Sequence, residues 1–336
     1  EILEIIDTPH EIQDKSSKKL KLQHGAISFN DVNFSYGENQ IFHDLNFHIK
    51  PGERVALVGE SGSGKTILMK TLIGLLPENG FLESGRIILN DNDITELSQK
   101  NTNNIRGKEI SMIFQDQETS LNPLRTVGFH LTEILQRYSS LNKIEVKEKA
   151  INLLSAVGID TPSIWLNKYP HELSGGMRQR VLIAMALACN SQIIIADEPT
   201  TALDVTVQAQ ILELLKTLKQ TNKSMFFITH DLSIAASICD RILVMYGSRI
   251  MEEIFVDDLF SNAKHPYTQA LLKTIPAIGI EPLEKFITIP GTAPSIETIE
   301  AGCPFYGRCS SAKEICKKEF PERKKVSEGH YYYCHQ

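Results

Sequence analysis

No apolar segment of the sequence is long enough to cross a membrane. A spanning helix needs about 20 consecutive, mostly apolar residues, and the longest run, Val181 to Cys189, has about half of that. The N-terminal residues are acidic and lack the basic and apolar pattern of a secretory signal. We therefore expect a soluble chain that takes part in membrane processes only through partners. Because Glu1 stands where a native start has Met, the chain is compatible with being a piece of a longer protein.

An excess of basic charge is also missing. The sequence has 35 Lys and Arg against 41 Asp and Glu, which gives a formal net charge of −6. This balance argues against a nucleic-acid-binding protein, because such proteins carry a basic stripe. Hydrophobic residues make up 42% of the 336 residues, so the chain can form a substantial core. The length suits one large domain with an appendage, or two modest domains.

Short apolar segments alternate with segments of helical spacing along most of the chain. Period-two alternation begins at Ala26, after a charged stretch over 1–25 that is typical of a linker. The order of strands and helices predicts an α/β domain with a parallel sheet. We expect buried strands at 54–58, 193–196 and 225–229, and helices at 67–76, 146–157 and 207–219. After about residue 262 the pattern breaks into segments with Pro, Gly and Cys, which predicts a smaller second unit over 263–336.

The most specific motif follows the first of these buried strands. It matches the phosphate-binding loop G-x-x-x-x-G-K-[ST] at every position. The matching residues are Gly59, Glu60, Ser61, Gly62, Ser63, Gly64, Lys65 and Thr66. In such a loop, backbone N–H groups surround the phosphates of ATP, the lysine reaches the β- and γ-phosphates, and the hydroxyl of the last residue binds Mg²⁺. The sequence therefore predicts an ATP site with Lys65 and Thr66 in these two roles.

Two acidic residues end the strand predicted at 193–196. Asp197 is placed to hold Mg²⁺ directly or through water, beside the phosphate loop. Glu198 is suited to act as the general base that polarises the attacking water. The pair predicts nucleotide hydrolysis in addition to nucleotide binding.

A third motif, Leu173-Ser174-Gly175-Gly176-Met177, resembles the LSGGQ signature of the ATP-binding cassette (ABC) family, with Met in the last position. The resemblance covers about residues 26–262. It implies a P-loop NTPase (RecA-like) core with a helical subdomain over about 116–180. In this family the signature contacts the γ-phosphate held by the opposite subunit, so Ser174, Gly175 and Gly176 are implied to act in a dimer with a second ABC ATPase.

The remaining family elements occur in the expected order. Gln115 resembles the glutamine that touches Mg²⁺ and the attacking water, and Asp204 in Ala202-Leu203-Asp204 resembles the D-loop at the dimer seam. His230 resembles the switch histidine at the γ-phosphate. Tyr36 stands where the family places an aromatic ring against the adenine.

Several stretches resemble the ATPase subunits of oligopeptide and dipeptide importers. They are 105–115, 120–123, 173–180, 265–272 and 289–294. The resemblance implies a peripheral protein on the cytoplasmic face of the plasma membrane, with two permease subunits and, indirectly, a solute-binding protein. Peptides are the expected solute, with nickel or another small solute as alternatives. The segment before Tyr36 resembles exporter cassettes instead, so a nucleotide-binding domain of an exporter is the alternative.

Four cysteines lie close together in the C-terminal part, at Cys303, Cys309, Cys316 and Cys334. Clustered cysteines in a cytosolic protein indicate metal rather than disulfides, but no pair has the C-x₂-C spacing of zinc ribbons. The importer resemblance favours a 4Fe–4S cluster with these four ligands. Zinc, with His330 or His335 as substitute ligands, and free or oxidised thiols remain alternatives.

Overall fold

The computed structural model describes residues 25–76, 79–95, 105–117, 119–201, 203–218, 223–275, 288–294 and 301–336. Most of the exporter-like head and Ala202 of the D-loop lie outside these ranges. Within them, no helix combines the length and the apolar character that a membrane span needs.

The larger of two sheets carries the site. Its eight strands run in the order β11-β12-β10-β9-β3-β8-β7-β6, and the neighbouring strands from β9 to β6 are parallel. Every residue of β3, β7, β8 and β9 is buried, as expected for strands covered on both faces. The parallel strands are β3 (Arg54–Val58), β6 (Ile110–Ile113), β7 (Ile193–Asp197), β8 (Ser224–Thr229) and β9 (Arg241–Tyr246).

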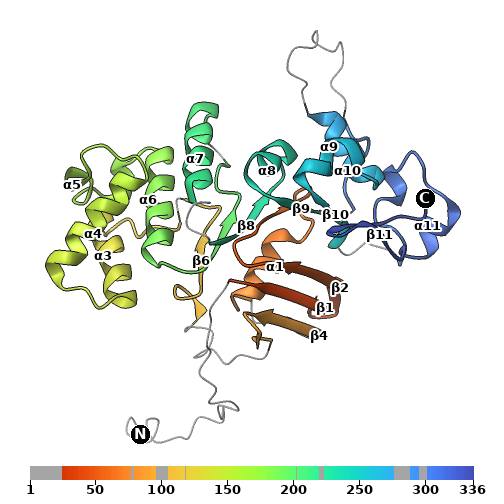
Figure 1. The fold of residues 1–336 in the computed structure, drawn as a ribbon, viewed down its shortest axis with the longest axis horizontal. Coiled ribbons are helices and arrows are strands. Elements are labelled where there is room, and N and C mark those ends of the chain that lie inside the picture. The colour runs from red at the N-terminus through yellow and green to blue at the C-terminus, as the bar shows by residue number, and fades with distance from the viewer. Residues whose placement is uncertain are drawn as a thin grey trace, which may run out of the picture.

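A smaller antiparallel sheet with the order β2-β1-β4-β5 lies beside the first (Figure 1). Its strands are β1 (Ile27–Tyr36), β2 (Asn39–Ile49), β4 (Gly80–Leu89) and β5 (Asn92–Asp93). Phe29 and Phe47 stack with ring centroids 4.5 Å apart, and Phe47 reaches Phe226 of β8 at 5.6 Å. These aromatic contacts join the two sheets through one shared core.

The α-helices of the described residues divide into three groups (Figure 1). Four lie at one end of the molecule, as α3 (Val127–Tyr138), α4 (Lys143–Ala156), α5 (Pro162–Trp165) and α6 (Gly175–Ala188). Three follow core strands, as α1 (Lys65–Leu72), α7 (Val205–Thr217) and α8 (Leu232–Ile238). The last three belong to the C-terminal part, as α9 (Val256–Asn262), α10 (Pro266–Thr274) and α11 (Glu314–Lys318). The α/β class and the strand–helix order are therefore confirmed.

Helix α1 is shorter than the helix predicted at 67–76. It ends because Gly74 adopts a left-handed conformation, with φ 64°. The Leu75 N–H then bonds to the Lys70 carbonyl at 2.8 Å and the Gly74 N–H to that of Thr71 at 3.1 Å. This pair of bonds is the Schellman pattern that satisfies the last carbonyls of a helix. Gly74 was thus the stop signal that apolar spacing alone overlooks.

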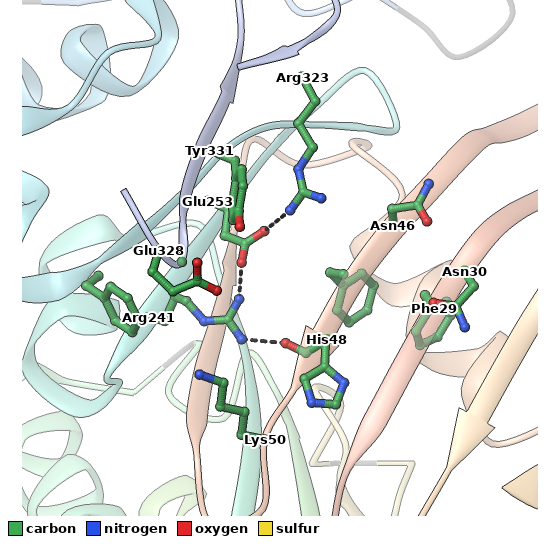
Figure 2. Close-up of a pocket in the computed structure, with 13 residues that line it drawn as sticks. Phe29, Asn30, Asn46, His48, Lys50, Arg241, Glu253, Arg323, Glu328 and Tyr331 are labelled. Carbon is green, nitrogen blue, oxygen red and sulfur yellow. Dashed lines mark hydrogen bonds and ion pairs between the residues drawn. The ribbon is translucent and has the colours of Figure 1, made fainter. Parts of the chain in front are cut away.

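The C-terminal segment adds a hairpin to the larger sheet. Strand β12 (His330–Tyr333) pairs with β10 (Arg249–Phe255), and β11 (Arg323–Ser327) pairs with β12. Figure 2 shows Glu253 of β10 between Arg241 and Arg323, with ion pairs to both guanidinium groups. A polar pocket of about 270 Å³ opens beside this network. The charged side chains of Arg241, Glu253 and Arg323 already pair with one another. We therefore interpret this network as a structural contact that attaches the hairpin to the sheet.

Candidate nucleotide-binding site

The phosphate loop joins β3 to α1, and its glycines are required by the surrounding backbone. A Cβ at Gly59 would lie 2.2 Å from the Met245 carbonyl oxygen. Gly62 and Gly64 have φ values of 82° and 94°, in the left-handed region that favours glycine. The loop therefore adopts a tight path at the start of α1, where the N-terminal N–H groups of the helix suit an anion.

Lys65 lies folded into this loop. Its Nζ donates to the carbonyl oxygens of Gly59 at 2.7 Å and Glu60 at 2.9 Å, and its side chain is buried. Burial lowers the pKa of Lys65, while the carboxylates of Glu198 and Asp197 oppose this shift. The ammonium group is thus held at the place where phosphate oxygens can replace the two carbonyl acceptors.

Asp197 ends β7 and faces the loop. Burial, and next the adjoining Glu198 carboxylate, raises the pKa of Asp197 to about 6, while a hydrogen bond from Thr66 lowers it. Among the described residues, Asp197 Oδ1 is a buried atom with no hydrogen-bond partner. A buried carboxylate oxygen that lacks a partner, next to a threonine hydroxyl, fits the hard oxygen ligands that Mg²⁺ prefers.

Three side chains converge on the carboxylate of Glu198. Gln115 Nε2 donates to Oε2 at 3.1 Å, and Thr201 Oγ1 donates to the same oxygen at 2.9 Å. His230 Nδ1 lies 3.5 Å from it. Glu198 itself has φ 44°, which is strained for a residue with a side chain. Strained residues of this kind cluster at functional sites. Thr201 was not predicted from the sequence, although it follows Glu198 by three residues.

The signature residues lie on another element. Ser174 caps α6 by accepting the Met177 N–H at 3.3 Å, and Gly175 begins the helix. Figure 1 places α6 among the helices at one end, apart from α1 behind the phosphate loop. Asp204 likewise caps α7, where its side chain accepts the Val207 N–H at 3.0 Å. One chain therefore gathers the phosphate loop with Asp197, Glu198, Gln115 and His230, but not with the signature.

Tyr36 lies at the end of β1, half-buried and edge-on to Phe34, with ring centroids 5.0 Å apart. Its ring packs close to Gly80 on the neighbouring strand, where a Cβ would lie 2.7 Å from Tyr36 Cε1. Gly80 therefore leaves space for an aromatic side chain at this corner. The arrangement keeps Tyr36 partly accessible, as a ring that stacks on a base must be.

Comparison with known proteins adds the family. The model of the family "ABC transporter" matches residues 42–201. The chain is 46% identical over 317 residues to the oligopeptide transport ATP-binding protein OppD of Bacillus subtilis, covering 94% of this chain and 88% of that protein. The chain belongs to the ABC transporter ATPases. ATP hydrolysis is the activity inherent in this family, and binding of ATP with Mg²⁺ is typical of it.

Other ABC relatives agree with this result. The dipeptide transport ATP-binding protein DppD of Bacillus subtilis is 42% identical and covers 94% of each chain. OppD of Salmonella typhimurium is 45% identical over 88% of this chain and 89% of that protein. A dimeric ATP-binding cassette bound to ADP and phosphate matches with a TM-score of 0.61 and 29% identity, over 68% of this chain and 98% of its own. The family "Oligopeptide/dipeptide transporter, C-terminal region" matches residues 251–316.

The four C-terminal cysteines are free, and their sulfur atoms receive backbone hydrogen bonds. Cys316 Sγ accepts the Lys313 N–H at 3.4 Å, and Cys334 Sγ accepts the Gln336 N–H at 3.5 Å. Burial, with smaller contributions from the other three thiols, raises the pKa of Cys303 to about 12, while a hydrogen bond from the Phe305 N–H opposes this shift. In the described part of the chain, no three His, Cys, Asp or Glu side chains form a group that could hold a metal ion.

The two histidines considered as zinc ligands are bonded elsewhere. His330 Nε2 lies 3.0 Å from Glu252 Oε1 in a fully buried pair. His335 Nε2 lies 3.0 Å from the Glu319 carbonyl oxygen. One ring nitrogen of each histidine is therefore engaged by another group, and among the described residues His330 Nδ1 is a buried atom with no hydrogen-bond partner.

An apolar pocket that the sequence did not predict lies beside Gln115. It has a volume of about 230 Å³ and is lined mostly by apolar side chains from β6, α3 and α6. Phe114 and Leu75, which line it, are 42% and 40% exposed. Exposed apolar side chains around a pocket indicate an interaction site. Phe114 lines the pocket, and the next residue in the chain, Gln115, donates a hydrogen bond to Glu198. The pocket is therefore one residue away from the group of side chains around Glu198.

Proposed function

We propose that this chain is the ATP-hydrolysing subunit of a peptide importer, bound at the cytoplasmic face of the plasma membrane. The observation that carries the proposal is the share of the chain that is similar to peptide-transport ATPases. It extends over 94% of the chain in two such relatives, one for oligopeptides and one for dipeptides. It therefore includes the C-terminal extension as well as the ATPase core.

In the proposed reaction, Lys65 holds the β- and γ-phosphates, and Thr66, Gln115 and Asp197 provide the oxygen atoms around Mg²⁺. The ion would neutralise phosphate charge, as in other P-loop enzymes. Glu198 takes the proton of the attacking water, and His230 contacts the γ-phosphate. Three contacts to one carboxylate support this assignment, since a general base needs a fixed position near the nucleophile. Tyr36 stacks against the adenine.

The proposed working unit is a dimer of ABC ATPases with two ATP molecules between them. Ser174, Gly175 and Gly176 start a 14-residue helix, and its N-terminal N–H groups suit a phosphate that the partner holds. Asp204 lies at the seam. The separation of α6 from α1 within one chain supports this assignment, because a signature that binds a γ-phosphate then needs a second subunit. Solved relatives form dimers, and one of these structures contains ADP and phosphate.

The pocket around Phe114 is the proposed docking site for the permease. Its apolar lining suits the apolar face of a helix that projects from a membrane subunit. Movement of such a helix reaches the γ-phosphate through Gln115 and Glu198, which are 3.1 Å apart. We propose two permeases per dimer and an indirect link to a solute-binding protein.

We also propose the domain boundaries expected from the sequence. These are a linker over 1–25, the nucleotide-binding domain over 26–262 with its helical subdomain at about 116–180, and the C-terminal extension over 263–336. The matches of the two families at 42–201 and 251–316 support two units of this order. The hairpin β11–β12 gives the extension a shared sheet with the core.

We also propose that the C-terminal extension binds a 4Fe–4S cluster through Cys303, Cys309, Cys316 and Cys334. Backbone N–H groups at all four sulfur atoms support it, because such hydrogen bonds accompany cluster thiolates. Bound iron would deprotonate the thiols and supply a structural cross-link. Anaerobically purified protein should contain about four iron and four sulfide ions per chain. Zinc without iron, or no metal at all, would contradict it.

Purification from gently solubilised native membranes tests the assembly. Every chain that copurifies with this subunit is identified by mass spectrometry. We expect two separate multi-span permeases and a second ABC ATPase. If the native subunit instead carries its own membrane spans, the exporter alternative holds and the proposal fails.

A further inference from the structure

The C-terminal extension contacts the phosphate loop through the side chain of Arg308. Its Nη1 donates to both carboxylate oxygens of Glu60, at 2.8 and 2.9 Å. Glu60 is the second residue of the loop, 248 positions earlier in the chain. The Arg308 side chain is 9% exposed and that of Glu60 is 29% exposed. The pair is therefore shielded from solvent more than an ordinary surface ion pair.

Other hydrogen bonds fix the guanidinium group in place. Nε donates to the Pro290 carbonyl oxygen at 2.8 Å, and Nη2 donates to that of Ile289 at 3.2 Å. Nη1 also donates to the Tyr246 hydroxyl at 3.0 Å. The planar group thus has its orientation set by two segments besides Glu60. Such a donor is positioned before a nucleotide arrives.

An aromatic cluster anchors the same turn of the extension against the core. Phe305 is buried, with its ring centroid 5.3 Å from that of Tyr246 and 5.2 Å from that of Tyr267. The Tyr267 hydroxyl accepts the backbone N–H of Glu60 at 3.3 Å. Residues beyond β9 therefore hold Glu60 by both its backbone and its carboxylate.

The ion pair between Arg308 and Glu60 changes the charge that the phosphate loop presents to ATP. A carboxylate in the phosphate loop repels the triphosphate, and at short range this repulsion is strong in the low dielectric of a partly buried site. The Arg308 guanidinium neutralises that carboxylate and draws it toward the extension. We propose that Arg308 is a positioning residue that holds and neutralises Glu60, so that the C-terminal extension sets the affinity of the phosphate loop for ATP. The inference rests on the proposed ATP site.

The same turn links the loop to the cysteines. Arg308 ends the short 3₁₀ helix Tyr306–Arg308, which lies between Cys303 and Cys309. The Cys303 N–H bonds to the Cys316 carbonyl oxygen at 2.7 Å, so the turn is also tied to α11. A rearrangement of these cysteines would therefore move the guanidinium group that holds Glu60.

Calorimetric titration of the full chain with Mg²⁺ and a non-hydrolysable ATP analogue tests the inference. Arg308→Gln should raise the dissociation constant about tenfold at low salt, and this effect should shrink as ionic strength rises. Glu60→Gln in the Arg308→Gln background should restore affinity to within about twofold of Glu60→Gln alone, because the repelling charge is gone. Equal affinity of Arg308→Gln and wild type would overturn the inference, and so would a failure of the double variant to recover.

Arg323→Gln is the matched control. Arg323 is also an arginine of the extension paired with a carboxylate, Glu253 at 3.2 Å, but it lies on β11 (Figure 2). Its replacement should leave the dissociation constant unchanged; an equal loss in this variant would refute a specific role for Arg308. If the wild-type chain binds no nucleotide, the proposed function fails. If it binds and only the Arg308 prediction fails, the proposed function stands.

Discussion

Glu198 is the residue on which the proposed chemistry depends most. It follows the buried strand β7, has a left-handed backbone conformation, and is contacted by Gln115, Thr201 and His230. Glu198→Gln keeps the size of the side chain and its ability to accept hydrogen bonds, but it removes the base. We expect ATP turnover to fall at least about a hundredfold while ATP binding persists.

Gel filtration of the same variant with ATP gives a second readout. Because hydrolysis reopens the proposed dimer, the Gln variant should elute as a dimer that the wild type forms only briefly. Turnover at the wild-type rate in Glu198→Gln would overturn the assignment of the base. The matched control is Glu213→Gln, a carboxylate that is 72% exposed on α7 and should turn over normally.

His265 gives the fold a predictable dependence on pH. Burial lowers the pKa of its imidazole from 6.5 to about 3, and its Nδ1 accepts the Tyr267 N–H at 3.0 Å. Between these two pKa values the unfolded chain binds a proton that the folded chain does not bind. Stability therefore falls as pH drops below 6.5, by about 1.4 kcal/mol per pH unit from this group.

His265→Asn keeps an acceptor for the helix N-terminus but does not titrate in this range. The free energy of unfolding, measured with urea at pH 7.5 and 5.5, should fall less between the two conditions in the variant than in the wild type. Equal losses in the two proteins would contradict a neutral, buried His265.

At the scale of elements, the contact between α6 and α7 constrains the signature. A Cβ on Gly176 would lie 2.5 Å from Val207 Cγ1, and valine has few alternative rotamers. A Cβ on Gly175 meets no described atom closer than 3.6 Å, namely Gln117 Oε1. Gly176→Ala should lower the free energy of unfolding by about 1–3 kcal/mol, because the helices must separate.

Gly175→Ala is the matched control, and it should be neutral or stabilise α6 by up to about 1 kcal/mol. Denaturation with urea measures both variants. An equal change in the free energy of unfolding in the two variants would show that close contact with Val207 is not the reason for glycine at position 176.

Local signals in the sequence predicted most elements and the residues of the candidate site. The phosphate loop, Asp197 and Glu198 stand next to buried strands, so each was recognisable from a short segment. Helix starts were less accurate, since α7 begins at Val205, two residues before the predicted start, and Asp204 provides its cap. The spacing of apolar residues reports which face is buried, whereas the caps decide where a helix begins.

Contacts between distant segments were not predictable. The pair of Arg308 and Glu60 joins the extension to the loop, and strand β12 pairs with β10. The sequence around Arg308 does not show that Glu60 is its partner, because one arginine can pair with many carboxylates. The sequence of β12 does not specify β10 either, because a short strand can pair with many others. The pocket at Phe114 is formed by β6, α3 and α6 together, and no single segment indicates it.

At the scale of the whole molecule, three regions are linked to one γ-phosphate in the proposed assembly. The helical end would offer the signature to a partner, the pocket at Phe114 would receive a permease helix, and the C-terminal end holds Glu60. Gln115 joins the second region to Glu198, and Arg308 joins the third to the loop. In this proposal, a short series of contacts connects the ATP site to each neighbouring subunit and to the C-terminal extension.

Uptake of a labelled tripeptide by the native cells tests whether this chain drives peptide import. The cells carry either the wild-type subunit or Glu198→Gln at the same level, and accumulation is followed over time. We expect accumulation with the wild type and its loss with the variant, because import then lacks ATP hydrolysis. Accumulation that is unchanged in the variant, or that rises as expected for a blocked exporter, would contradict this expectation.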